Sequence, residues 1–99
     1  MIQRFVCFKF KAGASQADIQ NHMQMFASLE KDIPQIISYH GGQILDEFEG
    51  AGKYDSAHYV TFANKQDVDL YFHHEAHQEF IKVNKQIWAD VLVVDSEIR

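Results

Sequence analysis

The chain has 99 residues, of which 46% are hydrophobic and 23% are charged, and its net charge is −5 with the histidines neutral. This size and composition are typical of one folded domain, which we expect to span residues 1–99, and the scattered Lys and Arg residues argue against a nucleic-acid-binding surface. The sequence predicts a cytoplasmic protein without a membrane span, because no apolar run approaches the roughly 18 to 20 residues that a span needs and no signal peptide is evident.

The N-terminal third of the chain predicts a strand followed by a helix. Residues 2–10 (IQRFVCFKF) are rich in strand formers and alternate, so that Arg4 lies on the more apolar face. Ser15 and Asp18 form a capping pattern that opens a helix, and Pro34 ends it near residue 33. Its apolar residues recur at helical spacing: Ile19, Met23, Phe26, Leu29 and Ile33. We expect His22 and His40 on the surface or in loops.

Two further strands are predicted in the middle of the chain. One runs from about Ile36 to Phe48 with a bulge or interruption at Gly41–Gly42, and residues 49–55 (EGAGKYD) form a loop. The second is residues 56–62 (SAHYVTF), whose alternation indicates a largely buried strand. His58 then lies on the same face of the sheet as Arg4.

The C-terminal third predicts two helical segments and a last strand. Asn64 and Asp67 cap a short helix on which Tyr71 faces inward. A second helix begins near Glu75 and ends before the strand of residues 90–98 (DVLVVDSEI). We expect its buried side to carry Ala76, Phe80, Val83 and Ile87, with His77 on the border of that side.

The resulting order is βαββαβ, which indicates an α+β fold of the ferredoxin-like type, with helices on one face of an antiparallel sheet. The other face would expose apolar residues of several strands: Phe5, Cys7, Ala57, Tyr59 and part of residues 91–94. A second copy of the same face covers such a patch economically, so we expect a homodimer. Cys7 is the only cysteine, so a disulfide within the chain and a cysteine-based zinc site are both excluded.

The stretch YFHHEAHQEF, residues 71–80, concentrates histidines next to aromatic residues. His74 and His77 are three residues apart, whereas a zincin-type helix needs two histidines four apart, and His73 precedes the expected helix. We therefore predict no physiological metal site here, although adventitious metal at His73, His74 and His77 in a crystal would not be surprising. His74 is a candidate to bind backbone groups at the helix start.

Four side chains remain as candidates for a ligand site. Tyr71 is either a core aromatic with a satisfied hydroxyl or a pocket residue, with His77 as a candidate partner for that hydroxyl. His77 is either a hydrogen-bonded structural group or an acid/base group. Arg4 either extends to the rim of the sheet or pairs with an anion in a cavity that it would share with His58.

Several stretches in order resemble the Dabb family of stress-responsive dimeric α/β-barrel proteins: residues 5–11 (FVCFKFK), 30–36 (EKDIPQI), 54–62 (YDSAHYVTF), 71–80 and 91–97 (VLVVDSE). The resemblance implies ferredoxin-like subunits whose sheets pair into a barrel. In one plant member, olivetolic acid cyclase, a tyrosine and a histidine act as acid/base groups in a ring closure, and they match Tyr71 and His77. Arg4 and His58 depart from that enzyme, and Glu75 replaces the proline of the family motif His-Pro-Ala-His.

Together these observations predict a cofactor-free protein that binds a small aromatic or polyketide-like acid. In this hypothesis Tyr71 and His77 carry acid/base chemistry, and Arg4, Phe26 and His58 contact the ligand. One alternative is a non-enzymatic stress-associated dimer whose cavity is filled by side chains such as Phe26, Phe80 and Trp88. Another is a cofactor-free monooxygenase of the same architecture. Whether the protein is an enzyme is left open by the sequence.

Overall fold

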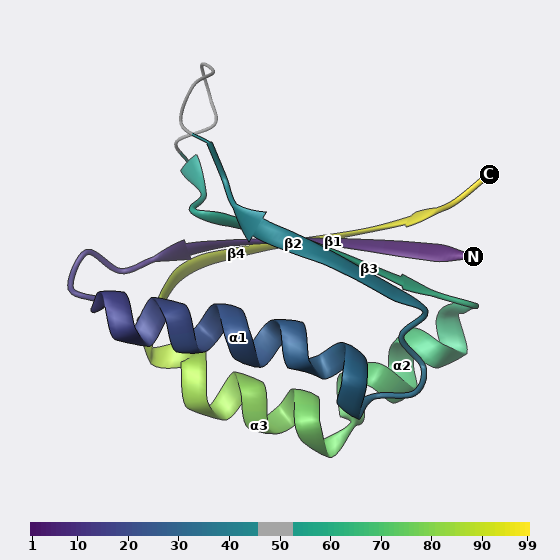
Figure 1. Ribbon diagram of the computed structural model, residues 1–99. Coiled ribbons are helices and arrows are strands. Elements are labelled where there is room, and N and C mark those ends of the chain that lie inside the picture. Colours follow the sequence, from purple (N-terminus) through teal and green to yellow (C-terminus); the bar gives the residue numbers. More distant parts are fainter. Residues whose placement is uncertain (46–52) are drawn as a thin grey trace.

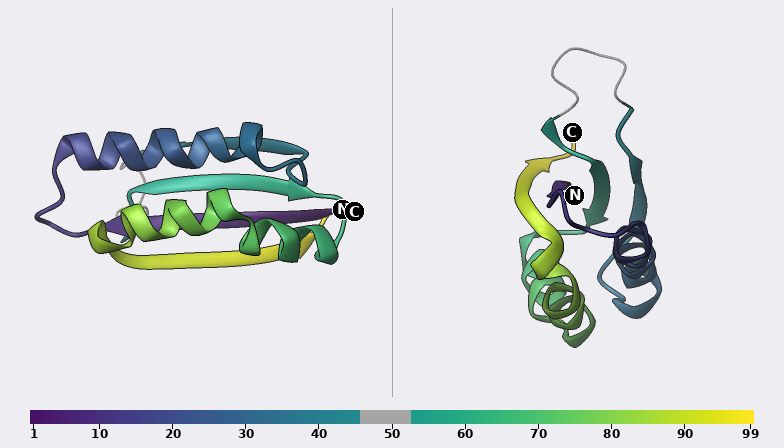
Figure 2. Two further views of the ribbon diagram at one scale, coloured as in Figure 1. Left: turned by 90° about the horizontal axis from the view of Figure 1, so that it is seen from below. Right: turned by 90° about the vertical axis from the view of Figure 1, so that its left-hand side faces the viewer.

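A computed structural model describes residues 1–45 and 53–99 of the chain. In this part of the chain the order is β1 (Ile2–Phe10), α1 (Gln16–Asp32), β2 (Ser38–Gln43), β3 (Ser56–Phe62), α2 (Lys65–His73), α3 (Glu75–Asn84), the short 3₁₀ helix η2 (Lys85–Ile87) and β4 (Trp88–Glu97). The strands form one antiparallel sheet in the order β2-β3-β1-β4. This is the predicted ferredoxin-like arrangement, and the helices all lie against the same face of the sheet (Figures 1 and 2).

Local capping explains where the helices begin and end. The Ser15 hydroxyl accepts a hydrogen bond from the Asp18 amide at 3.1 Å, and α1 stops at Ile33, directly before Pro34. The Asn64 side chain accepts from the Asp67 amide at 2.9 Å and opens α2. Both caps agree with the sequence-based expectation, because N-cap side chains act locally and need no tertiary context.

The core lies between the sheet and the helices and is rich in phenylalanine. Its buried members are Val6, Phe8, Phe10, Phe26, Leu29, Ile33, Ile36, Val60, Phe62, Val68, Tyr71, Phe80 and Ile87. The opposite face of the sheet is not covered by any described element (Figure 2). By strand alternation and register, the exposed residues Tyr59, Leu92 and Val94 lie on this face. Phe5 and Tyr59 are in ring contact on this face, with centroids 4.9 Å apart.

Three sequence-based expectations are wrong in detail. Strand β2 is regular through Gly41 and Gly42, which pair with His58 and Ala57 without a bulge, and the remainder of the expected strand at residues 46–48 lies outside the described residues. Strand β4 begins at Trp88, two residues before its predicted start. On α3 the buried residues are His77, Phe80 and Asn84, whereas Ala76 and Val83 are half-buried, so the buried side is rotated from the predicted row toward His77.

His22 is the largest departure from expectation, because it is completely buried instead of lying on the surface. It occupies the α1 stripe that also carries Ile19, Phe26 and Leu29, and its ring lies 4.5 Å from that of Phe8. Neither ring nitrogen has a hydrogen-bond partner in the described part of the chain. Its position in this stripe of α1 is the sequence signal that indicates burial, but a polar side chain at such a position is usually expected on the surface.

None of the described helices has the length and apolar character needed to cross a membrane. The two ends of the chain lie next to each other (Figure 1). The Ile98 amide donates to the Met1 carbonyl at 2.9 Å, which ties the end of β4 to the start of β1.

Candidate functional site

A cavity of about 210 Å³ lies between the sheet and the α2–α3 region. Its wall is mainly apolar and is formed by Val6, Phe8, Phe26, Phe72, Phe80, Ile81, Trp88, Val91 and Val93. The polar members of the lining are Arg4 from β1, Tyr71 from α2 and His77 from α3. The aromatic side chains therefore leave space here, and three of the sequence-predicted site residues meet at this cavity together with Phe26.

His77 reaches the cavity because the helical region is broken at His74. The His74 backbone is extended, with φ −61° and ψ 140°, so that it ends α2 and begins α3. Its Nδ1 accepts a hydrogen bond from the Ala76 amide at 3.0 Å, which confirms the predicted capping role. In a continuous helix the Ala76 amide would donate to the carbonyl of Phe72, four residues earlier. Because it donates to the His74 side chain instead, the Phe72 carbonyl can accept from other donors.

His77 Nδ1 lies 3.0 Å from the Phe72 carbonyl oxygen. A carbonyl oxygen only accepts hydrogen bonds, so Nδ1 carries the proton and Nε2 is left with the lone pair. Burial lowers the pKa of His77, and the bond to Phe72 opposes that shift in part. The ring is therefore neutral at neutral pH, with Nε2 as the nitrogen that can accept a proton.

Tyr71 is almost completely buried beside His77, with ring centroids 4.4 Å apart in an edge-to-face contact. Burial raises the pKa of Tyr71 above its ordinary value, an effect that the nearby Arg4 charge partly offsets. The phenol is therefore protonated and can donate a hydrogen bond. The two residues pack ring against ring, and the candidate hydroxyl–imidazole bond does not form through His77 Nδ1, which is bonded to Phe72.

Arg4 is held by a carboxylate that the sequence analysis did not single out. Its Nε and Nη2 donate to the two oxygens of Asp95 at 2.8 and 3.0 Å, a bidentate ion pair across the β1–β4 ladder. The guanidinium carbon lies 6.0 Å from the centroid of the Tyr71 ring. Arg4 and Asp95 are direct partners in the antiparallel register, which strand alternation alone does not predict.

His58 does not share this cavity, contrary to the expectation that it joins Arg4. It lies farther along the sheet, and its ring is stacked on Phe26 with centroids 4.2 Å apart. Its two nitrogens are engaged by the Tyr39 hydroxyl at 2.8 Å and the Ser56 hydroxyl at 3.0 Å. His58 is thus a buried, hydrogen-bonded residue behind Phe26, and burial lowers its pKa to about 4.

Gly41 leaves room for the Tyr39–His58 bond. A Cβ at this position would lie 2.2 Å from the Tyr39 hydroxyl oxygen and 2.7 Å from His58 Nδ1, whereas a Cβ at Gly42 would meet no atom within 4 Å. We expect Gly41→Ala to lower the free energy of unfolding by about 1–3 kcal/mol, because the Tyr39 ring must move and leave His58 with an unpaired nitrogen.

Urea unfolding of Gly41→Ala and Gly42→Ala, compared with the wild type, measures this effect. Both variants add the same methyl group to the same strand, so an equal loss of stability in the two would contradict the role assigned to Gly41.

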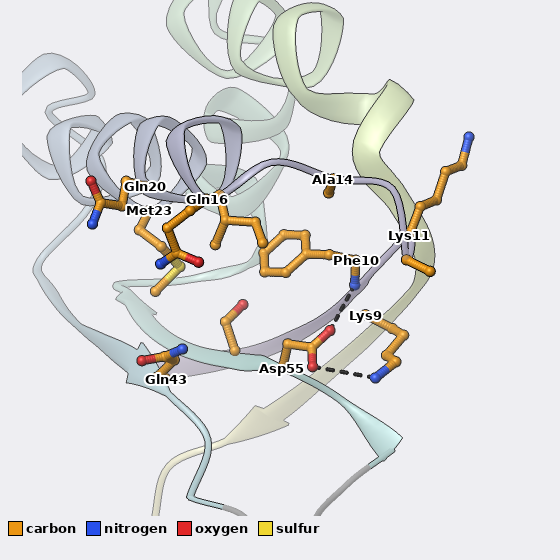
Figure 3. Close-up of a pocket in the computed structure, with 12 residues that line it drawn as sticks. Lys9, Phe10, Lys11, Ala14, Gln16, Gln20, Met23, Gln43 and Asp55 are labelled. Carbon is orange, nitrogen blue, oxygen red and sulfur yellow. Dashed lines mark hydrogen bonds and ion pairs between the residues drawn. The ribbon is translucent and has the colours of Figure 1, made fainter.

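A second, wider cavity of about 450 Å³ lies between the start of α1 and the ends of β1 and β3 (Figure 3). Asp55 accepts hydrogen bonds there from the Phe10 amide at 2.9 Å and from Lys9 Nζ at 3.3 Å. The Lys11 side chain extends away from the other labelled residues. None of the sequence-predicted site residues lines this cavity. Among the described lining residues the one carboxylate, Asp55, is already paired with Lys9.

Metal-ligating side chains do not converge within residues 1–45 and 53–99: no three His, Cys, Asp or Glu residues there are placed to hold an ion. His73 Nδ1 is bonded to the Asp69 carbonyl at 3.0 Å, and His74 Nδ1 is bonded to the Ala76 amide. With His77, whose Nδ1 is bonded to the Phe72 carbonyl, these make three neighbouring histidines that each bind a different backbone group through Nδ1.

The sequence matches a protein family over almost the whole chain. The family model of the stress responsive A/B barrel domain (Dabb) matches residues 2–98 of this sequence. No curated protein matches the sequence significantly. The solved structure of At3g17210 from Arabidopsis thaliana is similar with a TM-score of 0.89 and 25% identity, covering 100% of this chain and 96% of that one.

Two other solved structures share the fold at lower identity. A hydroxynitrile lyase from Passiflora edulis superposes with a TM-score of 0.87 and 20% identity over 99% of this chain and 93% of that one. A dimeric ferredoxin-like protein of unknown function from Thermobifida fusca does so with a TM-score of 0.86 and 18% identity over 98% and 90%. At these identities the likeness shows a common fold.

Proposed function

Because this chain belongs to the stress responsive A/B barrel (Dabb) family, we propose that it binds a small aromatic or polyketide-like acid in the cavity beside Tyr71 and His77. The observation that carries the proposal is the composition of this cavity. An apolar chamber with a few convergent polar groups is the usual form of a small-molecule site. Here the polar groups come from three different elements, and two of them are titratable.

The size of the cavity limits the ligand. An apolar cavity of about 150 Å³ holds benzene, so a cavity of 210 Å³ has room for one substituted ring. Phe8, Phe26 and Phe80 offer ring edges and faces to such a ligand, and the Arg4 end of the cavity receives its polar substituent.

Tyr71 and His77 are suited to proton transfer on such a ligand. Neutral His77 accepts a proton at Nε2, while the protonated phenol of Tyr71 donates a hydrogen bond to an oxyanion that develops on the ligand. The Phe72 carbonyl stabilises the imidazolium that results, because its oxygen already accepts from Nδ1. The reaction class that these roles support is proton abstraction next to a carbonyl group.

A related fold with a named activity exists in the Passiflora edulis hydroxynitrile lyase, although the proposal for this chain rests on its own cavity. The alternative of a non-enzymatic dimer predicts that no small acid binds near His77. The monooxygenase alternative shares the architecture and stays a prediction without a specific supporting contact.

A binding experiment with a His77 variant tests the proposal. We expect dihydroxybenzoic acids to raise the melting temperature of the wild type, and we expect His77→Ala to weaken their binding at least about fivefold, since it removes one wall of the cavity and its base. His73→Ala is the matched control, because it removes an exposed histidine four residues away on α2. Thermal-shift titrations measure the affinities, and identical ligand responses in His77→Ala and the wild type would remove His77 from the site.

The exposed face of the sheet supports a homodimer as the functional unit. Phe5, Tyr59, Leu92 and Val94 form an apolar surface on the face opposite the helices, and buried Cys7 lies among them. The Thermobifida fusca protein of the same fold is described as dimeric. In the proposed assembly two such faces pack against each other around a two-fold axis, and the cavity beside His77 lies on the helix side of each sheet.

A further inference from the structure

One ion pair lies between the cavity and a neighbouring depression of the surface beside β4. Arg4 lines the cavity beside Tyr71 and His77, and it also lines a separate surface depression of about 390 Å³ formed with Lys65, Asp69, Asp95 and Glu97. Asp95 belongs to the depression and not to the cavity lining. The carboxylate therefore binds Arg4 from the side of the depression, while the guanidinium carbon lies 6.0 Å from the centroid of the Tyr71 ring in the cavity lining.

The charge of Arg4 is largely compensated before any ligand arrives. Both oxygens of Asp95 accept from the guanidinium, and the Arg4 side chain is 16% exposed while that of Asp95 is 43% exposed, so solvent screens this pair in part. The bond to Arg4 lowers the pKa of Asp95, which keeps the carboxylate ionised. The polar end of the cavity thus carries a donor group without net charge.

A second acceptor can still reach the guanidinium. Asp95 uses Nε and one nitrogen of the fork, and no residue in the described part of the chain is hydrogen-bonded to Nη1. An arginine has five N–H donors, so the Nη1 edge can donate to a ligand oxygen while Asp95 keeps its own bonds. A ligand carboxylate in that position is repelled by the negative charge of Asp95, which binds the same guanidinium. An uncharged carbonyl group does not experience this repulsion.

We propose that Asp95 is the specificity-determining residue of this site and that it sets the balance between acidic and uncharged ligands. The inference rests on the function proposed for the cavity and adds how strongly the site discriminates between charged and uncharged ligands. With Asp95 ionised, Arg4 receives an uncharged carbonyl group or a carboxylate with little preference between them. Without that negative charge, Arg4 becomes an anion site and the cavity selects acids.

Asp95→Asn tests this directly, because asparagine keeps the size of the side chain and one acceptor oxygen while it removes the charge. Benzoate and benzamide are suitable probes, since they share a ring and a planar polar group and differ in charge. We expect Asp95→Asn to strengthen benzoate binding about tenfold and to change benzamide binding less than about twofold. Chemical-shift titration of the ¹⁵N-labelled protein measures both affinities.

Asp69→Asn is the matched control, because Asp69 lines the same depression and carries the same charge but makes no side-chain bond to Arg4. It should leave the ratio of benzoate to benzamide affinity within about twofold of the wild type. An unchanged ratio in Asp95→Asn, or a ratio that rises equally in both variants, would overturn the role of Asp95 and leave the binding cavity in place. If neither benzoate nor benzamide binds the wild type or either variant, the proposed function is overturned, and this inference with it.

Discussion

Replacing His22 with leucine is expected to raise the free energy of unfolding at pH 7 by about 1–3 kcal/mol. The imidazole is completely buried, and neither nitrogen has a hydrogen-bond partner in the described part of the chain. Each such group has lost its bonds to water without replacement, which costs roughly this amount. Leucine has a similar volume, strong helix propensity and no polar atom, and its neighbours Phe8, Phe10 and Phe80 are apolar.

The same substitution is expected to protect the protein against acid. Burial, with a smaller contribution from His58, lowers the pKa of His22 from 6.5 to about 3. Below pH 6.5 the imidazole takes up a proton in the unfolded chain and stays neutral in the folded one, so the unfolded state is favoured increasingly as the pH falls toward 3. At pH 4.5 this difference of two pH units corresponds to roughly 3 kcal/mol for His22.

Urea unfolding of the wild type and His22→Leu at pH 7 and pH 4.5 separates the two effects. We expect the stability advantage of His22→Leu to be larger at pH 4.5 by that amount, while His58, with a pKa of about 4, continues to destabilise both proteins in acid. His73→Leu is the control, because it removes an exposed histidine from a helix. An advantage of His22→Leu that is absent at pH 7 and does not grow in acid would contradict the buried, neutral state of His22.

Tyr59→Asp is expected to convert the proposed homodimer into a monomer. Tyr59 lies on β3, one of the two central strands, and it is 41% exposed on the open face beside Phe5. Two-fold symmetry introduces the charge twice into the same interface, where each carboxylate would lose its water without gaining a partner. Since Tyr59 is exposed in the single subunit, the substitution should leave the subunit folded.

Sedimentation or light scattering at micromolar concentration measures the outcome, with circular dichroism as the check on folding. Leu70→Asp is the matched control, because Leu70 is 49% exposed on α2, on the helix side of the molecule. It removes a comparable apolar side chain and adds the same charge, yet it should leave the dimer intact. A wild type that is monomeric, or a Tyr59→Asp variant that stays dimeric, would contradict the open face as the interface.

The sequence and the structure agree most closely where short-range rules apply. Ser15, Asn64 and His74 act as caps through atoms two or three residues away, so their roles could be predicted from the sequence. Strand alternation likewise placed Arg4 on the face that the helices cover, and it placed Tyr59 on the open face. The pairing of Tyr71 with His77 is predicted by the inward face of the short helix and by the family resemblance, whereas the cavity at which they meet is not required by periodicity or composition.

The departures concern residues whose surroundings come from distant parts of the chain. His22 follows the apolar stripe of α1, but its burial depends on the rings of β1, α3 and β4 that enclose it. His58 has the same strand phase as Arg4, yet Phe26 of α1 stands in front of it and Tyr39 of β2 binds it. Asp95 stands 91 positions from Arg4, and only the pairing of β1 with β4 makes them partners.

The sequence by itself determined the order of the elements, the ends of the helices and the apolar face left open on the sheet, because caps and periodicities depend on neighbours a few residues away. Only the tertiary structure decided which polar side chains are buried, which are paired and where the aromatic residues leave space. Those properties depend on the register between strands and on how side chains from separate elements fill a shared volume. The candidate site at Tyr71, His77 and Arg4, with its counter-ion Asp95, is a product of that second level.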